Sequence, residues 1–264
     1  MVPAVSLDAW RQQAPWPNEI DVEQDLILTR LIVDVACHPL LGDELAFRGG
    51  TCLHKLHAPR AARYSDDLDY VRTTTGPVQE IMAALREILL AAGLEEDDYA
   101  QKRDAVSMRF DAQPTSGLGR IRVKIEINTR ETTPRFDHVR LPLRIDNPWF
   151  AAQAHVQTFE LVELLGTKLR ALYQRRKGRD LFDLWLGLTR LEVASHQVIA
   201  AFHHYLELTG TEISRADFER NLADKLNHRG FRADLDQLLA EPPAGYDIDV
   251  AAALVQERLV ALLD

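Results

Sequence analysis

The chain has 264 residues, a formal net charge of −9 and a hydrophobic fraction of 46%, which is typical of a globular protein with one large or two modest domains. The negative charge argues against a generally basic nucleic-acid binder, but it leaves room for a local basic groove. Two cysteines, Cys37 and Cys52, argue against a disulfide scaffold or zinc cluster and fit a reducing compartment. With no signal-peptide pattern and no apolar run long enough to cross a bilayer, we expect a cytoplasmic protein without a membrane partner.

Up to about residue 150 the sequence mixes helical and strand patterns. Periodicity and composition predict helices at 22–38 and 77–92, and strands at 44–48, 67–72, 105–112 and 120–130. A glycine pair ends the first strand, and a short helix is expected at 51–57. The last strand alternates cleanly, with Ile or Val on one face and charged or polar residues on the other.

Beyond about residue 150 every predicted element is a helix. These helices are expected at roughly 158–176, 179–190, 194–208, 215–226, 232–239 and 249–263. The change at "DNPWF" predicts two domains, 1–150 and 151–264. The predicted fold class is therefore α+β, with a mixed sheet in the N-terminal domain and a helical bundle in the C-terminal domain.

The strand at 67–72 carries two carboxylates at its start. Asp67 and Asp69 are two residues apart and share one face, with Leu68 and Tyr70 on the other. Like charges on one face repel each other, and a divalent cation between them removes that repulsion. Mg²⁺ prefers such a site, with a few carboxylates, retained waters and substrate phosphates. For this pair taken alone, a solvated turn before the strand is the competing interpretation.

The segment upstream of the aspartates has the features of a phosphate site. Gly49 and Gly50 permit close approach of the backbone, and the helix that follows presents free N–H groups. Thr51 adds a hydroxyl, and Lys55 lies one helical turn later on the same face. The glycine spacing matches neither a Walker A motif nor a dinucleotide fingerprint, and a plain tight turn is the alternative for the glycines alone.

A third carboxylate, Glu126, lies on the polar face of the strand at 120–130. Two metal ions at a phosphorus atom call for a third acidic ligand, and Glu126 is the candidate. The alternative is a solvent-facing glutamate among arginines and lysines.

Lys168 lies on an apolar stripe of its predicted helix, between Leu164 and Leu172. A buried lysine needs a partner or a ligand, so we expect it to face a cleft and bind phosphates, although snorkelling is an alternative. Asp180 and Asp183 share a face of the next helix and are candidate partners for it.

The loop between these two helices, "QRRKGR", is the most basic stretch of the chain. Arg175, Arg176 and Lys177 are candidates for contact with a nucleic-acid backbone. They fit equally well as cations at an ordinary helix C-terminus, where the dipole favours positive charge.

Four motifs in a fixed order resemble the AbiEii/AbiGii toxin family: "FRGGTCLHKL", "RYSDDLDYV", "KIEI" and "LLGTKLRALYQRRKGRDLFDLW". Members of this family, which includes the mycobacterial MenT toxins, are nucleotidyltransferases of the DNA polymerase β-like superfamily. The resemblance covers roughly residues 25–190. It implies a polymerase-β-like N-terminal domain and a helical domain that contributes lysine and aspartate to the active-site cleft.

The resemblance also implies roles for individual residues. The residues implied as catalytic are Asp67, Asp69, Glu126, Lys168 and Asp180, and the first three of these are the implied metal ligands. The residues implied to bind nucleotide are Gly49, Gly50, Thr51, Lys55, Lys168, Arg179 and Asp183. The basic residues Arg175, Arg176 and Lys177 are implied to bind RNA.

The function implied is that of a toxin in a toxin–antitoxin or phage-defence system. It would use Mg²⁺ or Mn²⁺ to transfer nucleotides from an NTP to RNA, and the RNA expected is tRNA, at its 3′ acceptor end, with a block of translation as the result. A cognate antitoxin protein is the expected partner. Two rival functions remain open: phosphotransfer to a protein or to itself at the same site, and a module that only senses a nucleotide.

Overall fold

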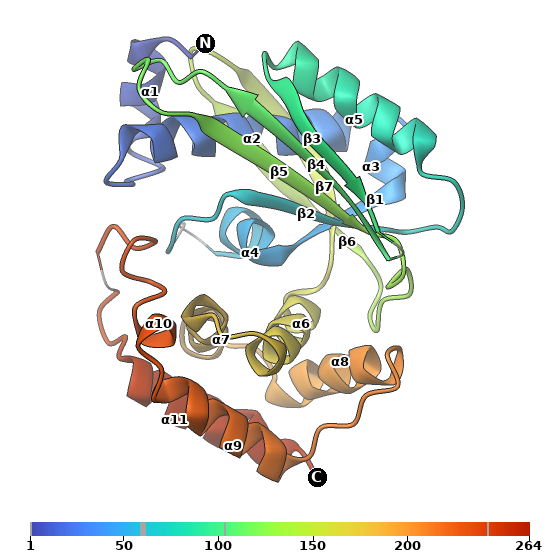
Figure 1. Ribbon diagram of the computed structural model, residues 1–264, viewed down its shortest axis with the longest axis vertical. Helices are drawn as coiled ribbons and strands as arrows, with labels where there is room; N and C mark the ends of the chain where they lie inside the picture. Colours follow the sequence, from blue (N-terminus) through green and yellow to red (C-terminus); the bar gives the residue numbers. More distant parts are fainter. Residues whose placement is uncertain (1, 59–61, 103, 242) are drawn as a thin grey trace. The chain divides into compact units, whose positions relative to one another are not determined.

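The computed structural model describes residues 2–58, 62–102, 104–241 and 243–264. They form two compact units: Met1–Thr133 with His138–Phe159, and Pro134–Asp137 with Glu160–Asp264. In the part of the chain described, the first unit combines a sheet with helices, whereas the second is built from helices (Figure 1). This arrangement confirms the predicted α+β class.

The sheet of the first unit has seven strands in the order β3-β4-β5-β2-β1-β7-β6. The strands are β1 (Leu45–Arg48), β2 (Asp67–Arg72), β3 (Glu95–Gln101), β4 (Ala105–Ala112), β5 (Ile121–Asn128), β6 (Val139–Asp146) and β7 (Ala151–Thr158). Strand β2 pairs in parallel with β5, as β1 does with β7, and the other neighbours are antiparallel. The sheet is therefore mixed, as predicted.

Helices pack on this sheet and build its core. They are α1 (Ala4–Trp10), α2 (Glu19–Cys37), α3 (Leu41–Glu44), α4 (Gly49–Cys52) and α5 (Gln79–Ala91), and a π-helical turn, Leu53–His57, continues α4. Helix α2 packs against β5 and β7. The Ile and Val side chains of β5 are all buried while its charged residues are not, which confirms the predicted alternation.

Three strands were not predicted from the sequence: β3, β6 and β7. Strand β3 has the sequence "EEDDYAQ", which lacks the run of apolar residues that is typical of a strand, and it is almost wholly exposed. Strand β6 contains Pro142, which is tolerated because β6 lies at the edge of the sheet. Strand β7 is rich in Ala and Gln. The first unit includes these strands and extends to Phe159, and the domain boundary near residue 150 stays a prediction.

The second unit contains six α-helices among its described residues. They are α6 (Leu161–Gln174), α7 (Gly178–Arg190), α8 (Ser195–Glu207), α9 (Arg215–Leu226), α10 (Arg229–Arg232) and α11 (Ile248–Arg258), and a 3₁₀ turn, Val260–Leu262, follows. Helix α6 packs against α7 and α8. The prediction of a helix at 232–239 is wrong. Helix α10 ends at Arg232, and turns follow it. In these turns the Asp234 carboxylate accepts a hydrogen bond from the backbone N–H of Arg179. No helix within the described ranges is long and apolar enough to span a membrane.

Candidate active site

The carboxylates predicted as metal ligands lie together on one face of the sheet. In the parallel pairing of β2 with β5, Asp69 is the register partner of Glu126, and Asp67 is the partner of Lys124. Register partners on neighbouring strands project to the same side. All three carboxylates are half-buried, whereas Leu68 on the opposite face is fully buried. The sequence placed Asp67 and Asp69 on one face, and the structure adds Glu126 to it.

One cation lies among these carboxylates. The Lys124 Nζ atom is 2.8 Å from a carboxylate oxygen of Glu126. Burial lowers the pKa of Lys124, but the hydrogen bond that its ammonium donates to Glu126 and the negative charges of Asp67, Glu126 and Asp69 outweigh burial and raise that pKa. The raised pKa keeps Lys124 positively charged beside the three carboxylates.

The donor set of this face suits a hard divalent cation. Asp67 and Asp69 supply the few carboxylate oxygens that Mg²⁺ needs when it keeps water and phosphate ligands. In the part of the chain that the structure describes, no group of three or more His, Cys, Asp or Glu is already arranged to hold a metal ion. Because Glu126 pairs with Lys124, its role as the third ligand stays a prediction.

The two glycines make room for side chains of the segment that leads into β2. Gly49 has a φ of +86°, and a Cβ atom there would lie 2.3 Å from the Asp69 carboxylate. At Gly50 a Cβ atom would lie 2.4 Å from a guanidinium nitrogen of Arg63. A side chain at either position would thus displace Asp69 or Arg63. The predicted glycine turn therefore lies directly against the carboxylate face.

Two side chains predicted to bind nucleotide have partners within the protein. The Thr51 hydroxyl is buried and lies 2.6 Å from the backbone carbonyl oxygen of Asp67. The Lys55 ammonium lies 2.6 Å from a carboxylate oxygen of Asp25. That carboxylate also accepts hydrogen bonds from the indole N–H groups of Trp10, at 2.7 Å, and Trp16, at 3.1 Å. Nucleotide binding by Thr51 and Lys55 stays a prediction.

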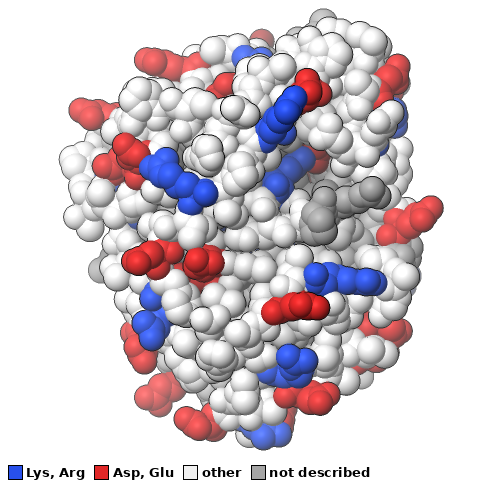
Figure 2. All heavy atoms as spheres, turned by 180° about the vertical axis from the view of Figure 1, so that it is seen from behind, with Lys and Arg blue, Asp and Glu red and all other residues white. Residues whose placement is uncertain are grey.

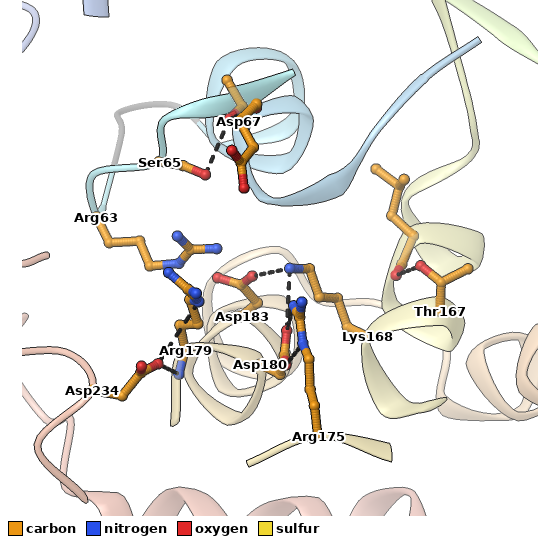
Figure 3. A network of polar contacts seen from close by, with 12 residues as sticks. Arg63, Ser65, Asp67, Thr167, Lys168, Arg175, Arg179, Asp180, Asp183 and Asp234 are labelled. Atoms are coloured by element: carbon orange, nitrogen blue, oxygen red, sulfur yellow. Dashed lines mark hydrogen bonds and ion pairs between the residues drawn. The ribbon is translucent and has the colours of Figure 1, made fainter. Parts of the chain in front are cut away.

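The charged residues predicted on α6 and α7 form a buried cluster in the helical unit. The Lys168 side chain is 8% exposed, and its Nζ atom lies 2.8 Å from Asp183 and 3.4 Å from Asp180. Asp180 also accepts two hydrogen bonds from the Arg175 guanidinium, at 2.7 and 2.8 Å (Figure 3). Burial raises the pKa of Asp180, but Lys168 and Arg175 outweigh burial and hold it below its usual value. Because its ammonium is buried, Lys168 does not snorkel.

The basic loop between α6 and α7 is largely paired with acidic residues. Besides the bonds of Arg175 to Asp180, Lys177 lies 3.5 Å from Asp234, and the Arg179 guanidinium lies 3.8 Å from the same carboxylate (Figure 3). On the face drawn in Figure 2, acidic and basic side chains lie interspersed. Asp234 could not be predicted from the sequence, because its partners lie more than fifty residues away along the chain. RNA binding by the loop stays a prediction.

The fold is similar to those of solved nucleotidyltransferase structures. Similar solved structures include JHP933 from Helicobacter pylori (TM-score 0.59, 16% identity, covering 93% of this chain and 92% of that one). A putative nucleotidyltransferase from H. pylori is also similar (TM-score 0.57, 17% identity, 94% and 99% covered). A third is MenT4, the nucleotidyltransferase toxin Rv2826c from Mycobacterium tuberculosis H37Rv (TM-score 0.52, 16% identity, 95% and 99% covered). Comparison with curated proteins gave no match.

A family model described as "Nucleotidyl transferase AbiEii toxin, Type IV TA system" matches residues 30–255. The chain therefore belongs to the AbiEii family of nucleotidyltransferase toxins, as the four ordered motifs predicted. Membership in this family implies a nucleotide substrate and an antitoxin partner.

Proposed function

We propose that the protein transfers a nucleotide from an NTP to the 3′ acceptor end of tRNA in the cytoplasm, with Mg²⁺ or Mn²⁺, and thereby blocks translation. The observation that supports this reaction is the shared face of Asp67, Asp69 and Glu126 beside the glycine turn. Carboxylate oxygens on a half-exposed face are accessible to a divalent cation that carries a triphosphate, whereas those of a buried face would not be.

The residues of the first unit have distinct roles in this proposal. Asp67 and Asp69 hold the cation, which when bound neutralises charge on the triphosphate. Glu126 accepts the proton of the RNA 3′-hydroxyl, whose oxygen then bonds to the α-phosphorus as the bond to pyrophosphate breaks. Gly49 and Gly50 leave the backbone accessible to the phosphates.

For the helical unit we carry over the roles that the family resemblance implies. Lys168 and Arg179 neutralise the triphosphate, and Asp180 and Asp183 hold Lys168 in place, a role consistent with their ion pairs to it. Arg175, Arg176 and Lys177 contact the RNA backbone.

The test is incubation of the purified protein with total tRNA, Mg²⁺ and each α-³²P-NTP in turn, followed by a denaturing gel. We expect label on tRNA, and we expect Asp69→Ala to abolish it. Asp66→Ala is the matched control, because Asp66 is exposed and precedes β2; its product should still be labelled. Full activity in a folded Asp69→Ala variant would overturn the site.

The two rival functions give different results in the same experiment. Label from γ-³²P-NTP on the protein itself would indicate phosphotransfer. Binding of NTP with no label on RNA or protein would indicate a module that senses the nucleotide.

A further inference from the structure

Strand β2 extends beyond the end of its neighbour β1. The antiparallel pairing runs from Leu45 opposite Arg72 to Arg48 opposite Asp69, and there β1 gives way to the glycine turn and α4. Asp67, the first residue of β2, therefore has no β1 residue opposite it. A backbone carbonyl in this position needs another hydrogen-bond partner.

The Thr51 hydroxyl is that partner. Its Oγ1 atom lies 2.6 Å from the Asp67 carbonyl oxygen and 3.0 Å from the Ser65 hydroxyl. A hydroxyl has one proton, and a carbonyl oxygen only accepts. Thr51 therefore donates its proton to Asp67, and the Ser65 hydroxyl donates to Thr51. The Thr51 side chain has no second proton to offer a phosphate.

The segment that carries Ser65 is itself fastened against the glycine turn. Arg63 is 2% exposed, its guanidinium donates to the Tyr64 carbonyl at 3.0 Å, and a second guanidinium nitrogen lies against Gly50. Arg63, Ser65 and Asp67 follow one another on the segment that enters β2 (Figure 3). Thr51, Arg63 and Ser65 help to line a small cavity of ≈ 10 Å³, which brings the start of α4 and the segment before β2 together.

We propose that Thr51 and Ser65 are positioning residues for the metal carboxylate of Asp67. They fix the backbone at the start of β2, and thereby the direction in which the Asp67 carboxylate points, instead of binding phosphate themselves. The inference rests on the proposed function in that it takes Asp67 to be a metal ligand. It assigns a role to Ser65, and it replaces the phosphate-binding role predicted for Thr51.

Mn²⁺ binding in the absence of nucleotide tests this inference, because a phosphate-binding residue would not affect it. Mn²⁺ affinity is measured by electron paramagnetic resonance on the full-length protein. We expect Thr51→Val and Ser65→Ala each to weaken Mn²⁺ binding about tenfold, as loss of a hydrogen bond that orients a ligand does. Thr51→Ser keeps the hydroxyl and should restore the affinity.

Thr29→Val is the matched control for loss of a buried hydroxyl. The Thr29 hydroxyl donates to the carbonyl of Asp25 at 2.7 Å within α2, an element that carries none of the three carboxylates, so Mn²⁺ affinity should stay that of the wild type. Ser65→Ala covers the case in which Thr51→Val does not fold, because Ser65 is only half-buried.

The outcomes separate this inference from the proposed function. Wild-type Mn²⁺ affinity in Thr51→Val, with a raised KM for NTP, would return Thr51 to phosphate binding and overturn the inference. Wild-type Mn²⁺ affinity in both Thr51→Val and Ser65→Ala would overturn it as well. Wild-type Mn²⁺ affinity in Asp69→Ala would instead overturn the metal site on which the proposed function rests.

Discussion

Two charged clusters of the protein, one in each unit, differ in burial. On the sheet, the carboxylates of Asp67, Asp69 and Glu126 are half-buried, and the cations on their face include Lys124, which pairs with Glu126, and Arg48, the register partner of Asp69. In the helical unit, two fully buried carboxylates face two cations, in ion pairs of 2.7–3.4 Å (Lys168, Arg175, Asp180 and Asp183).

The burial of charged groups and their pairing are linked by the cost of removing a charge from water. An uncompensated buried charge costs several kcal/mol, so a buried cluster persists only when its charges are paired. A half-exposed face keeps its excess charge at little cost, because water screens the repulsion. The half-exposed carboxylates of the sheet are therefore accessible to a ligand, whereas the buried ion pairs of the second unit join α6 to α7.

The largest expected effect follows from removing one charge of the buried cluster in the helical unit. Lys168→Met leaves Asp183 buried without its ammonium partner and should lower the free energy of unfolding by about 3–5 kcal/mol. Urea denaturation measures this loss. The double variant Lys168→Met/Asp183→Asn also removes the Asp183 charge and should recover part of the lost free energy of unfolding. A Lys168→Met protein of unchanged stability and no transferase activity would show that the cluster serves catalysis alone.

Loss of a charge on the sheet face should affect stability much less. Asp69→Asn removes one charge from a half-buried position, so the free energy of unfolding should change by less than about 1 kcal/mol. Nucleotide transfer should fall by about a thousandfold, since loss of a metal carboxylate removes several kcal/mol of transition-state stabilisation. Urea denaturation and the tRNA-labelling assay, run on one preparation, check both. A marked loss of stability would mean that the face is structural.

The pH dependence of stability should also distinguish the two clusters. Because the pKa of Asp180 is lowered in the folded protein, its contribution to stability is complete above its usual value of 3.8 and is lost as the pH falls further. In Lys168→Met the largest attraction that lowers this pKa is absent, so burial should raise it. Acid unfolding, followed by circular dichroism, should then begin at a higher pH than in the wild type. Identical acid transitions would contradict the pairing.

Some features of these clusters could be predicted from the sequence and others could not. The difference lies in how far apart along the chain the contacting residues are. Period-two alternation placed Glu126 on the polar face of β5, because that signal is local. The register that brings Glu126 beside Asp69 depends on pairing between strands more than fifty residues apart, which one sequence does not reveal. Strands β6 and β7 were missed for a related reason, since pairing with each other and with β1 outweighs their weak local propensity.

Individual side chains follow the same rule. The hydroxyl of Thr51 and the ammonium of Lys55 were recognised, but their partners were not. The Asp67 carbonyl and the Asp25 carboxylate meet them only in the folded chain. Asp25 has the sequence appearance of an ordinary polar residue on a helix. The two tryptophans that precede it, Trp10 and Trp16, are the one signal that favours a buried acceptor there.

The smallest expected effect concerns Lys124, which pairs with Glu126 on the sheet face. Its ion pair with Glu126 is about one-third exposed on the lysine side, so Lys124→Gln should change the free energy of unfolding by less than about 1 kcal/mol. Removing this cation lowers the positive charge beside the three carboxylates, so Mn²⁺ affinity should rise a few-fold in the same paramagnetic resonance titration. Arg144→Gln is the control, because it removes an exposed cation of the edge strand β6 that pairs with Asp146, and it should leave the affinity unchanged. Weaker Mn²⁺ binding in Lys124→Gln would mean that the lysine holds Glu126 in place for the metal. The ion pair on the sheet face would then orient a carboxylate, as the ion pairs of the helical cluster do.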